Sequence, residues 1–209
     1  IILEPVGKNT APAATLAAIY LKELYPQEDL CILVMPADHK IDDNKGFIES
    51  VKSSIKEASN SLCIFGIEPS SPSTSYGYIE ILRSSGAGLL DVLNFHEKPE
   101  EKIAKKYIST GNYYWNSGIF LFSVSHFLSS IKKTDNIIFE TCQDSIKNFE
   151  KDNKVIRPNK TIFESCPSNS LDYALMERAA EHDISVKMNP LNSSWNDLGT
   201  WKSLYDSKN

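Results

Sequence analysis

A carboxylate and an imidazole, Asp38 and His39, follow two residues after a short apolar run at residues 31–35. Such a run, rich in branched side chains and ended by Pro36, is typical of a strand buried on both faces of a sheet. In open α/β sheets, ligands bind in the crevice beyond the carboxyl ends of the strands. The sequence therefore predicts an acid where a substrate would lie. Taken alone, Asp38 is equally consistent with a turn or a helix cap.

The composition bounds the kind of partner. The chain has 209 residues, of which 41% are hydrophobic and 23% charged, with a net charge of -5. This is ordinary globular composition, and the acidic balance argues against a non-specific nucleic-acid binder. It leaves phosphate substrates open, because a metal ion can supply local positive charge. No apolar run reaches the length of a membrane span, so we do not expect a membrane as a partner. The acidic net charge leads us to expect no nucleic-acid partner either.

The four cysteines are widely scattered, at positions 31, 63, 142 and 166. No pair has the C-x-x-C spacing of a zinc site or a redox motif. Cys31 and Cys63 lie in apolar runs and are expected to be buried free thiols. This usage is typical of a reducing compartment, and we expect a cytoplasmic protein.

The first third of the chain alternates between strand and helix patterns. Residues 1–3 resemble the end of a strand, and a helix with Pro12 in its first turn ends before Pro26. The strand at 30–35 is followed by a helix over 44–59 and a strand over 61–67. We expect Phe47, Val51, Ile55 and Ala58 to face inward on that helix. Such alternation predicts a parallel sheet with crossover helices.

The pattern then changes. Residues 76–83 and 89–97 predict two antiparallel strands joined through Gly86 and Gly88. Helices are expected from Pro99, over 125–133 and 136–149, and from Pro167 with Leu171, Ala174, Leu175 and Ala179 inward. The segment 113–124 is aromatic and apolar, 151–162 is irregular, 184–188 is a short strand, and 195–201 is a turn before a last short helix.

Seven motifs occur in one order along the chain. They are Glu4-Pro5 with Asn9-Thr10-Ala11-Pro12, Pro36-Ala37-Asp38-His39, Tyr76-Gly77-Tyr78-Ile79, Glu97-Lys98-Pro99, Trp115-Asn116-Ser117-Gly118, Leu171-Asp172-Tyr173-Ala174-Leu175-Met176-Glu177 and Trp195-Asn196-Asp197-Leu198-Gly199-Thr200-Trp201. Each alone is weak, but together they resemble the mannose-1-phosphate guanylyltransferase (GDP-mannose pyrophosphorylase) family of sugar nucleotidyltransferases. The resemblance runs from residue 1 to about residue 205.

The resemblance implies one nucleotidyltransferase domain over residues 1–209, with a Rossmann-like, mixed but mainly parallel sheet flanked by helices. It implies transfer of GMP from GTP to mannose 1-phosphate, giving GDP-mannose, a polysaccharide precursor, and pyrophosphate. The family's glycine-rich segment, which holds the triphosphate, would precede Ile1. We therefore expect residues 1–209 alone to be inactive. Oligomeric state is not fixed by these features, and a homodimer stays open.

The reaction joins two anions, so charge must be neutralised and the reactants aligned. The resemblance matches Asp38 and Asp197 to the family's metal ligands, with Mg²⁺ as the expected cofactor. Lys98 matches the group that binds the sugar phosphate, a task suited to a mobile point charge. These three form the expected catalytic set. For His39, a structural hydrogen bond is favoured over a metal bond.

The expected substrate-binding residues follow from the same motifs. Glu97 and Asn116 match residues that bond sugar hydroxyls, which need acceptors and donors at fixed positions. Gly77 fits a place where the backbone approaches the sugar closely. Asn9 and Thr10 match the region facing the base, and Pro36 and Ala37 complete the set. Four aromatic residues are assigned to the core instead: Tyr76, Trp115, Trp195 and Trp201.

One departure and two alternatives remain. The family usually has Thr-Gly-Tyr-Gly-Tyr, whereas this chain has Ser75 at the first glycine, which would be strained if that position needs positive φ. The alternatives are a nucleotidyltransferase for another sugar or base, such as a glucose-1-phosphate thymidylyl- or uridylyltransferase, and a non-catalytic sugar-nucleotide-binding regulator. The residues of the motifs at 9–12 and 115–118 favour the guanylyltransferase over the other nucleotidyltransferases. The presence of both Asp38 and Asp197 favours an enzyme over a non-catalytic regulator.

Overall fold

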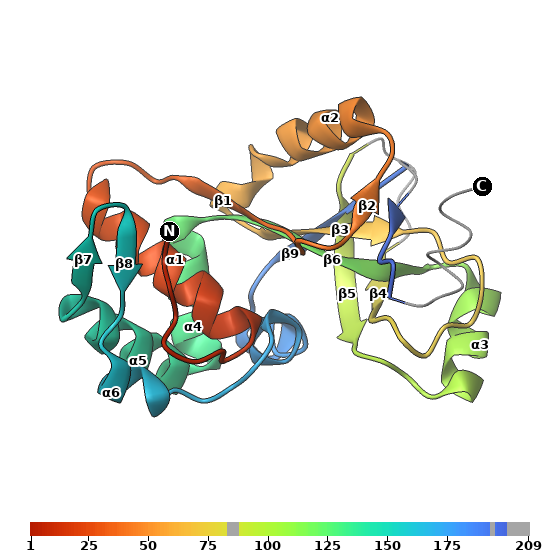
Figure 1. Cartoon of the computed structure of the whole chain (residues 1–209). Helices are drawn as coiled ribbons and strands as arrows, with labels where there is room; N and C mark the ends of the chain where they lie inside the picture. The colour runs from red at the N-terminus through yellow and green to blue at the C-terminus, as the bar shows by residue number, and fades with distance from the viewer. Residues whose placement is uncertain (83–87, 193–194, 200–209) are drawn as a thin grey trace. The chain divides into compact units, whose positions relative to one another are not determined.

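The computed structural model describes residues 1–82, 88–192 and 195–199. The chain forms two compact units, one from 1–32 and 122–184 and the other from 33–121 and 185–209. The helices of Figure 1 are α1 (Thr10–Leu24), α2 (Asn44–Ser54), α3 (Glu101–Thr110), α4 (Val124–Thr134), α5 (Asn136–Lys147), α6 (Lys160–Glu164) and the short helices η1 (Glu57–Ser59), η2 (Asp172–Met176) and η3 (Ala180–His182). The strands are β1 (Cys31–Val34), β2 (Lys40–Ile41), β3 (Leu62–Ile67), β4 (Tyr78–Ile81), β5 (Leu90–His96), β6 (Tyr113–Ser123), β7 (Glu150–Asp152), β8 (Val155–Arg157), β9 (Val186–Pro190) and β10 (Trp195–Asn196).

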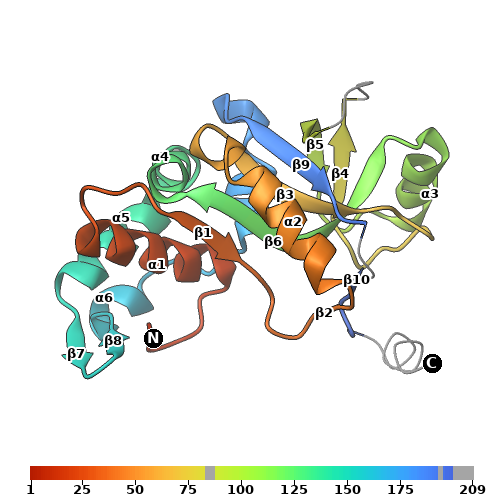
Figure 2. The same ribbon diagram turned by 90° about the horizontal axis from the view of Figure 1, so that it is seen from above.

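The first unit is built on three helices, α1, α4 and α5, which lie side by side in Figures 1 and 2. Each begins at a residue whose side chain accepts a backbone N–H, namely Asn9, Ser123 and Asp135. Such caps satisfy donors that a helix start leaves unpaired. The buried faces of these helices supply the core of the unit, including Leu16, Ile19, Phe127, Ile131, Ile138 and Ile146. The predicted positions of all three helices are confirmed.

Two predictions for the first unit are wrong. The segment expected to be irregular contains an antiparallel pair, β7 with β8, and the short helix α6. All three residues of β7 are charged and exposed, so no apolar alternation marked it in the sequence. Residues 1–3 do not add a strand to the large sheet. Ile2 instead makes an isolated parallel bridge with Ile156 of β8.

The segment after Pro167 has the expected buried face but another helical form. Leu171, Ala174, Leu175 and Ala179 are all buried, as predicted. The backbone is a π-helix at η2, followed by a 3₁₀ turn at η3, rather than a continuous α-helix. Short π segments occur mostly as local bulges, which sequence periodicity does not distinguish from an α-helix.

The six-stranded sheet, most of which belongs to the second unit, has the order β1-β6-β3-β9-β5-β4. An α/β fold with a mixed sheet flanked by helices is therefore confirmed. The expectation that the sheet is mainly parallel is wrong: of the five registers that the described strands of this sheet give, β3–β9 alone is parallel. Strand β6 pairs antiparallel with both β3 and β4. The sequence did not predict these pairings, because the residues of a strand do not specify which strand lies beside it. The predicted antiparallel pairing of the strands that became β4 and β5 is confirmed, and Gly86 of their connection lies outside the described residues.

Strand β1 is less buried than predicted. Its burial is only partial, Cys31 is exposed, and Met35 is 51% exposed, so the expectation of a buried Cys31 thiol is wrong. The reason is that β1 stands last in the strand order, where fewer neighbours cover it. Cys63, in the inner strand β3, is buried as expected.

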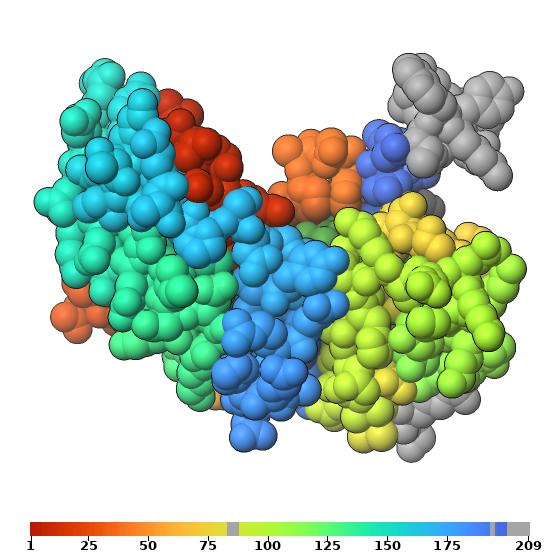
Figure 3. Space-filling model, turned by 90° about the horizontal axis from the view of Figure 1, so that it is seen from below, coloured from red at the N-terminus to blue at the C-terminus, as the bar shows by residue number. Residues whose placement is uncertain are grey.

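Helix α2 covers β3 and β6 through Phe47 and Val51, which pack against a cluster of Ala58, Cys63, Phe65, Ile119 and Leu121. Ile55, also predicted to face inward, is 45% exposed because α2 ends at Ser54 and its periodicity stops there. Helix α3 packs through Ala104 and Tyr107 onto Tyr78 and Trp115. Most of its other side chains are exposed, and α3 contributes to the yellow-green surface in Figure 3.

No helix within residues 1–82, 88–192 and 195–199 combines the length and apolarity needed to cross a membrane. The last short helix expected after the turn at 195–201 and Trp201 itself lie outside the described residues.

Candidate functional site

The two acids that the sequence analysis paired are joined by a two-stranded ribbon in the second unit. Strand β10 pairs antiparallel with β2, with Trp195 opposite Ile41 and Asn196 opposite Lys40. Continuing this register by one residue sets Asp197 opposite His39. Asp38 is the residue immediately before His39. The ribbon thus brings Asp38 and Asp197 to the same end of one small structure. Neither β2 nor β10 was predicted, because a two-residue strand carries no periodicity.

A contact between the side chains of His39 and Trp195 connects the two sides of the ribbon. The indole N–H of Trp195 donates a hydrogen bond to Nδ1 of His39 over 3.2 Å, and the two rings meet edge to face at 5.3 Å. His39 therefore has the structural hydrogen bond that the sequence analysis favoured for it.

Asp197 accepts a local hydrogen bond and lies near Tyr76. Oδ1 of Asp197 accepts the backbone N–H of Gly199 over 3.2 Å. Burial raises the pKa of Tyr76 to about 12, and the nearby charge of Asp197 acts on that pKa in the same direction. The sequence analysis assigned Tyr76 to the core and missed this proximity, which no local pattern could have revealed.

The donor set fits a hard divalent cation. Within the described part of the chain, no three His, Cys, Asp or Glu side chains gather as a metal-binding group. Mg²⁺ does not require such a cage, because it is usually bound by one or two carboxylates together with substrate phosphates and waters. Asp38 is exposed and Asp197 is half-buried, so both carboxylates can meet a ligand from solvent. Asp38 and Asp197 are thus the residues that would hold such an ion.

The three residues expected at the sugar converge on one point. A Cβ placed on Gly77 would lie 2.6 Å from Oε2 of Glu97 and 3.4 Å from Cβ of Asn116. The backbone N–H of Asn116 donates to the carbonyl of Gly77 over 2.8 Å. Strand β4 pairs with both β5 and β6, so the sheet brings these residues together from three parts of the chain. A Cβ at position 77 would therefore force the Glu97 carboxylate to move.

Lys98 stands at the edge of this cluster. Its Nζ lies 3.2 Å from Oε1 of Glu97, and its side chain is 59% exposed whereas that of Glu97 is 9% exposed. The backbone of Lys98 has φ = 45°, a left-handed conformation that is uncommon for a residue with a side chain. Lys98 therefore presents a solvent-accessible ammonium group beside a nearly buried carboxylate.

The loop that carries Pro36 and Ala37 lies against β6. A Cβ built on Gly118 would be 3.4 Å from Cγ of Pro36 and 3.9 Å from Cε1 of His39. Gly118 has φ = 71°, so a side chain there would also be strained. Since Asn116 is two residues from Gly118 on the same strand, the loop before Asp38 and the Gly77–Glu97–Asn116 cluster both adjoin the segment 116–118. Ser75 is absent from the positive-φ residues of the described chain, so its replacement of the usual glycine costs nothing there.

Asn9 and Thr10 belong to the first unit, where both have structural contacts. Asn9 has φ = 72°, and its Oδ1 accepts the N–H of Thr10 over 2.8 Å at the start of α1. The hydroxyl of Thr10 accepts the N–H of Leu171 over 2.9 Å, and the N–H of Ala11 donates to the carbonyl of Asn169. These bonds fix the start of α1 against the loop before η2. The other predicted site residues all belong to the second unit.

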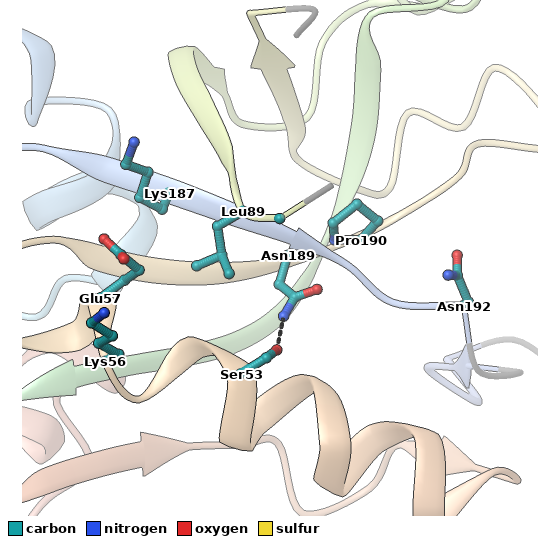
Figure 4. Close-up of a pocket in the computed structure, with 9 residues that line it drawn as sticks. Ser53, Lys56, Glu57, Leu89, Lys187, Asn189, Pro190 and Asn192 are labelled. Atoms are coloured by element: carbon teal, nitrogen blue, oxygen red, sulfur yellow. Dashed lines mark hydrogen bonds between the residues drawn. The ribbon is translucent and has the colours of Figure 1, made fainter. Parts of the chain in front are cut away.

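A polar hollow of about 540 Å³ in the second unit contains none of the predicted residues. It lies between η1, the end of α2 and β9 (Figure 4). One of its amides, Asn189, donates to Oγ of Ser53 over 3.1 Å and to the carbonyl of Ser50 over 2.9 Å, and one of its ammonium groups, Lys187, is paired with Asp91. Because none of the residues in the sequence motifs lines this hollow, we do not assign the site to it.

Comparison with known proteins covers nearly the whole chain. The sequence profile of the nucleotidyl transferase family matches residues 1–209. Mannose-1-phosphate guanylyltransferase of Escherichia coli is 42% identical over 212 residues, which cover 99% of this chain and 45% of that protein. The alginate biosynthesis protein AlgA of Pseudomonas aeruginosa is 38% identical over 209 residues, covering 99% of this chain and 42% of AlgA. The chain thus spans less than half the length of these curated relatives.

The fold has a counterpart among solved structures. The crystal structure of mannose-1-phosphate geranyltransferase from Thermus thermophilus superposes with a TM-score of 0.82 at 28% sequence identity. The match covers 97% of this chain and 56% of that chain.

Proposed function

Because the chain belongs to the nucleotidyl transferase family, we propose that the protein carrying it transfers GMP from GTP to mannose 1-phosphate, giving GDP-mannose and pyrophosphate. The names of its curated relatives support this choice of substrates. The observation that carries the proposal is the β2–β10 ribbon, because it gathers Asp38 and Asp197 at one end. Two carboxylates on a short ribbon are what a phosphate-bound Mg²⁺ needs from a protein.

The chemistry is an in-line displacement at phosphorus. A phosphate oxygen of mannose 1-phosphate attacks the α-phosphorus of GTP, a P–O bond forms, and the bond to the β-phosphate oxygen breaks to release pyrophosphate. Asp38 and Asp197 would hold Mg²⁺, which neutralises charge on the reacting phosphates when bound. Catalysis then rests on positioning and on electrostatic stabilisation rather than on a covalent intermediate.

The remaining residues bind and orient the substrates. Lys98 supplies a mobile positive charge for the sugar phosphate, and the neighbouring Glu97 and Asn116 bond the sugar hydroxyls. Gly77 leaves the sugar room beside Glu97, since a Cβ there would meet that carboxylate at 2.6 Å. Pro36 and Ala37 form the wall that precedes Asp38. Asn9 and Thr10 act at the base, presented by the capped start of α1.

We also propose that this reaction takes place in the cytoplasm, in keeping with four cysteines that form no disulfide within the described residues. The product would serve the synthesis of mannose-containing polysaccharides.

A ligand panel followed by turnover tests the proposal. Stabilisation against heat by GTP and GDP-mannose, with smaller shifts for UTP and dTTP, is expected because a ligand stabilises only the state that binds it. Pyrophosphate release is then measured with mannose 1-phosphate and with glucose 1-phosphate in the full protein. A preference for UTP or dTTP with glucose 1-phosphate would identify the alternative nucleotidyltransferase. Binding of GDP-mannose without any turnover would identify a regulatory protein.

A further inference from the structure

Strand β6 carries an irregularity next to the residue assigned to the sugar. In the pairing of β6 with β3, Ile64 lies opposite Phe120, whereas Gly66 lies opposite Asn116. Strand β3 thus advances by two residues where β6 advances by four, which makes a β-bulge in β6 at residues 117–119. Bulges are over-represented beside active sites, where they re-aim a side chain.

The side chain of Ser117 bridges the two strands at this bulge. Continuing the register before the bulge by one residue would set Phe65 opposite Ile119. Instead, the hydroxyl of Ser117 donates to the carbonyl of Phe65 over 2.7 Å and accepts the backbone N–H of Ile119 over 3.3 Å. Ser117 is 1% exposed, so removing its hydroxyl would take a partner from two backbone groups in a buried place.

The same bulge orients the side chain of Asn116. Its Oδ1 accepts the backbone N–H of Gly118 over 3.1 Å, and Gly118 has φ = 71°. The backbone N–H of Asn116 is itself bound to the carbonyl of Gly77 over 2.8 Å. The backbone of Asn116 is thus held by the segment before β4, and its carboxamide takes its direction from an N–H inside the bulge.

We propose that Ser117 is a positioning residue that holds the bulge of β6 and so keeps the Asn116 carboxamide directed at the sugar. The inference rests on the proposed function, because it takes Asn116 as a residue that bonds the sugar hydroxyls. Without the Ser117 hydroxyl, the two buried backbone groups regain partners when residues 117–119 move toward a regular ladder. Such a movement takes the N–H of Gly118 away from Oδ1 of Asn116.

Loss of any buried hydroxyl lowers stability, so stability alone does not test the proposal. Ser117→Ala is therefore compared with Ser61→Ala. Ser61 is 3% exposed, directly precedes β3, and has its hydroxyl bonded to that of Ser185 over 2.9 Å. Both variants lose one buried hydroxyl in the second unit, but Ser117→Ala loses it beside Asn116.

The experiment measures steady-state pyrophosphate release by the full protein, with mannose 1-phosphate and GTP varied in turn. We expect Ser117→Ala to raise KM for mannose 1-phosphate by about tenfold and KM for GTP by less than about twofold, because a misplaced binding group affects the substrate that it binds. Ser61→Ala should leave both KM values within about twofold of the unmodified protein. If Ser117→Ala does not fold, Ser117→Cys takes its place, because a thiol fills the position but is a weak donor.

A double-mutant cycle tests whether Ser117 acts through Asn116. Asn116→Ala and the double variant Asn116→Ala with Ser117→Ala are measured in the same assay. Once the carboxamide is gone, there is nothing left for the bulge to direct. We therefore expect Ser117→Ala to add less than about twofold to KM for mannose 1-phosphate in the Asn116→Ala protein.

An unchanged KM for mannose 1-phosphate in Ser117→Ala would overturn the inference, and so would equal rises in Ser117→Ala and Ser61→Ala. Effects of Asn116→Ala and Ser117→Ala that multiply would overturn it as well, because Ser117 would then act independently of Asn116. Failure of the proposed function has another signature, in which the unmodified protein forms no GDP-mannose but uses another sugar 1-phosphate or nucleotide. The same comparison of KM for that sugar phosphate then decides the inference. A protein that turns over no sugar phosphate would overturn both.

Discussion

The hydrogen bond from the indole of Trp195 to Nδ1 of His39 joins two residues 156 positions apart in the chain. Each of the two residues lies near an acid assigned to the metal. His39 directly follows Asp38, and Trp195 precedes Asp197 by two residues. The bond therefore helps to set the separation of the two carboxylates. The side chains of His39 and Trp195 thus connect the two strands β2 and β10 of the ribbon.

The first prediction concerns the two acids. Asp38→Asn and Asp197→Asn, made separately in the full protein, are each expected to lower kcat/KM for GDP-mannose formation on the order of 10²-fold or more. An amide lacks the charge that holds the cation, and metal stabilisation of developing charge contributes several kcal/mol. Steady-state pyrophosphate release at several Mg²⁺ concentrations measures the loss. Near-normal turnover in either variant would refute the metal assignment.

The second prediction concerns the close approach at Gly77. Gly77→Ala would place a Cβ 2.6 Å from Oε2 of Glu97 and 3.0 Å from the ring of Phe95. The carboxylate must move, so we expect KM for mannose 1-phosphate to rise at least about tenfold and the free energy of unfolding to fall by about 1–3 kcal/mol. Kinetics and urea denaturation measure the two effects.

Gly7→Ala is the control for that substitution, because a Cβ at Gly7 would meet nothing within 4 Å. Gly7→Ala should leave KM for mannose 1-phosphate, KM for GTP and the free energy of unfolding close to those of the unmodified protein. If Gly77→Ala behaves like Gly7→Ala, the cluster of Gly77, Glu97 and Asn116 does not bind the sugar.

The third prediction concerns Lys98. Lys98→Ala is expected to raise KM for mannose 1-phosphate by about 10- to 150-fold, which corresponds to the loss of a charge-assisted hydrogen bond. KM for GTP should change much less. Lys102→Ala on the exposed face of α3 removes the same charge at another position and serves as the control. Equal effects of Lys98→Ala on both substrates would indicate a structural role for this residue.

The fourth prediction concerns pH and Glu4. Burial raises the pKa of Glu4 above its ordinary value of 4.5, and Oε1 of Glu4 is buried with no hydrogen-bond partner among the described residues. Between the unfolded and the raised pKa the folded state binds more protons than the unfolded state, so stability falls as pH rises through that window. Glu4→Gln mimics the protonated form and should abolish this fall, leaving the variant more stable than the unmodified protein above the window.

Urea denaturation midpoints, measured at a series of pH values from below the ordinary pKa of Glu4 up to neutrality, test this dependence. Glu49→Gln, a substitution at an exposed residue of α2, is the control and should keep the pH dependence of the unmodified protein. A Glu4→Gln variant whose midpoint falls with pH as steeply as before would show that Glu4 is not the group responsible.

The positions of helices and strands in the sequence were predictable where the pattern is strong. The helices α1, α4 and α5 and the strands β3 and β5 lie where periodicity placed them, because an apolar face or run is a local property of the chain. The order of the seven motifs could also be recognised from the sequence, because a motif is defined by neighbouring residues and does not depend on the tertiary structure. The short strands β2, β7 and β10 were missed, because two or three residues carry too little pattern.

Pairing between distant segments was decided by the tertiary structure alone. Strands β5 and β6 each pair antiparallel with two neighbours, whereas local alternation suggested a parallel sheet. The partial exposure of β1 and the exposed thiol of Cys31 follow from the place of β1 at the end of that order. A strand's own residues specify which faces are apolar but not which strand lies beside it.

The same division holds at the site. The sequence alone identified Asp38, Asp197, Glu97, Lys98 and Asn116 as chemically able residues in a recognisable order. The β2–β10 register brought Asp197 to the loop of Asp38, and the meeting of β4, β5 and β6 set Gly77 against Glu97. The proximity of Tyr76 to Asp197 had no trace in the sequence, because a tyrosine in an aromatic cluster has the same pattern whether or not a carboxylate lies near it. Chemistry is a property of residue type, whereas distance between remote residues exists only once the chain has folded.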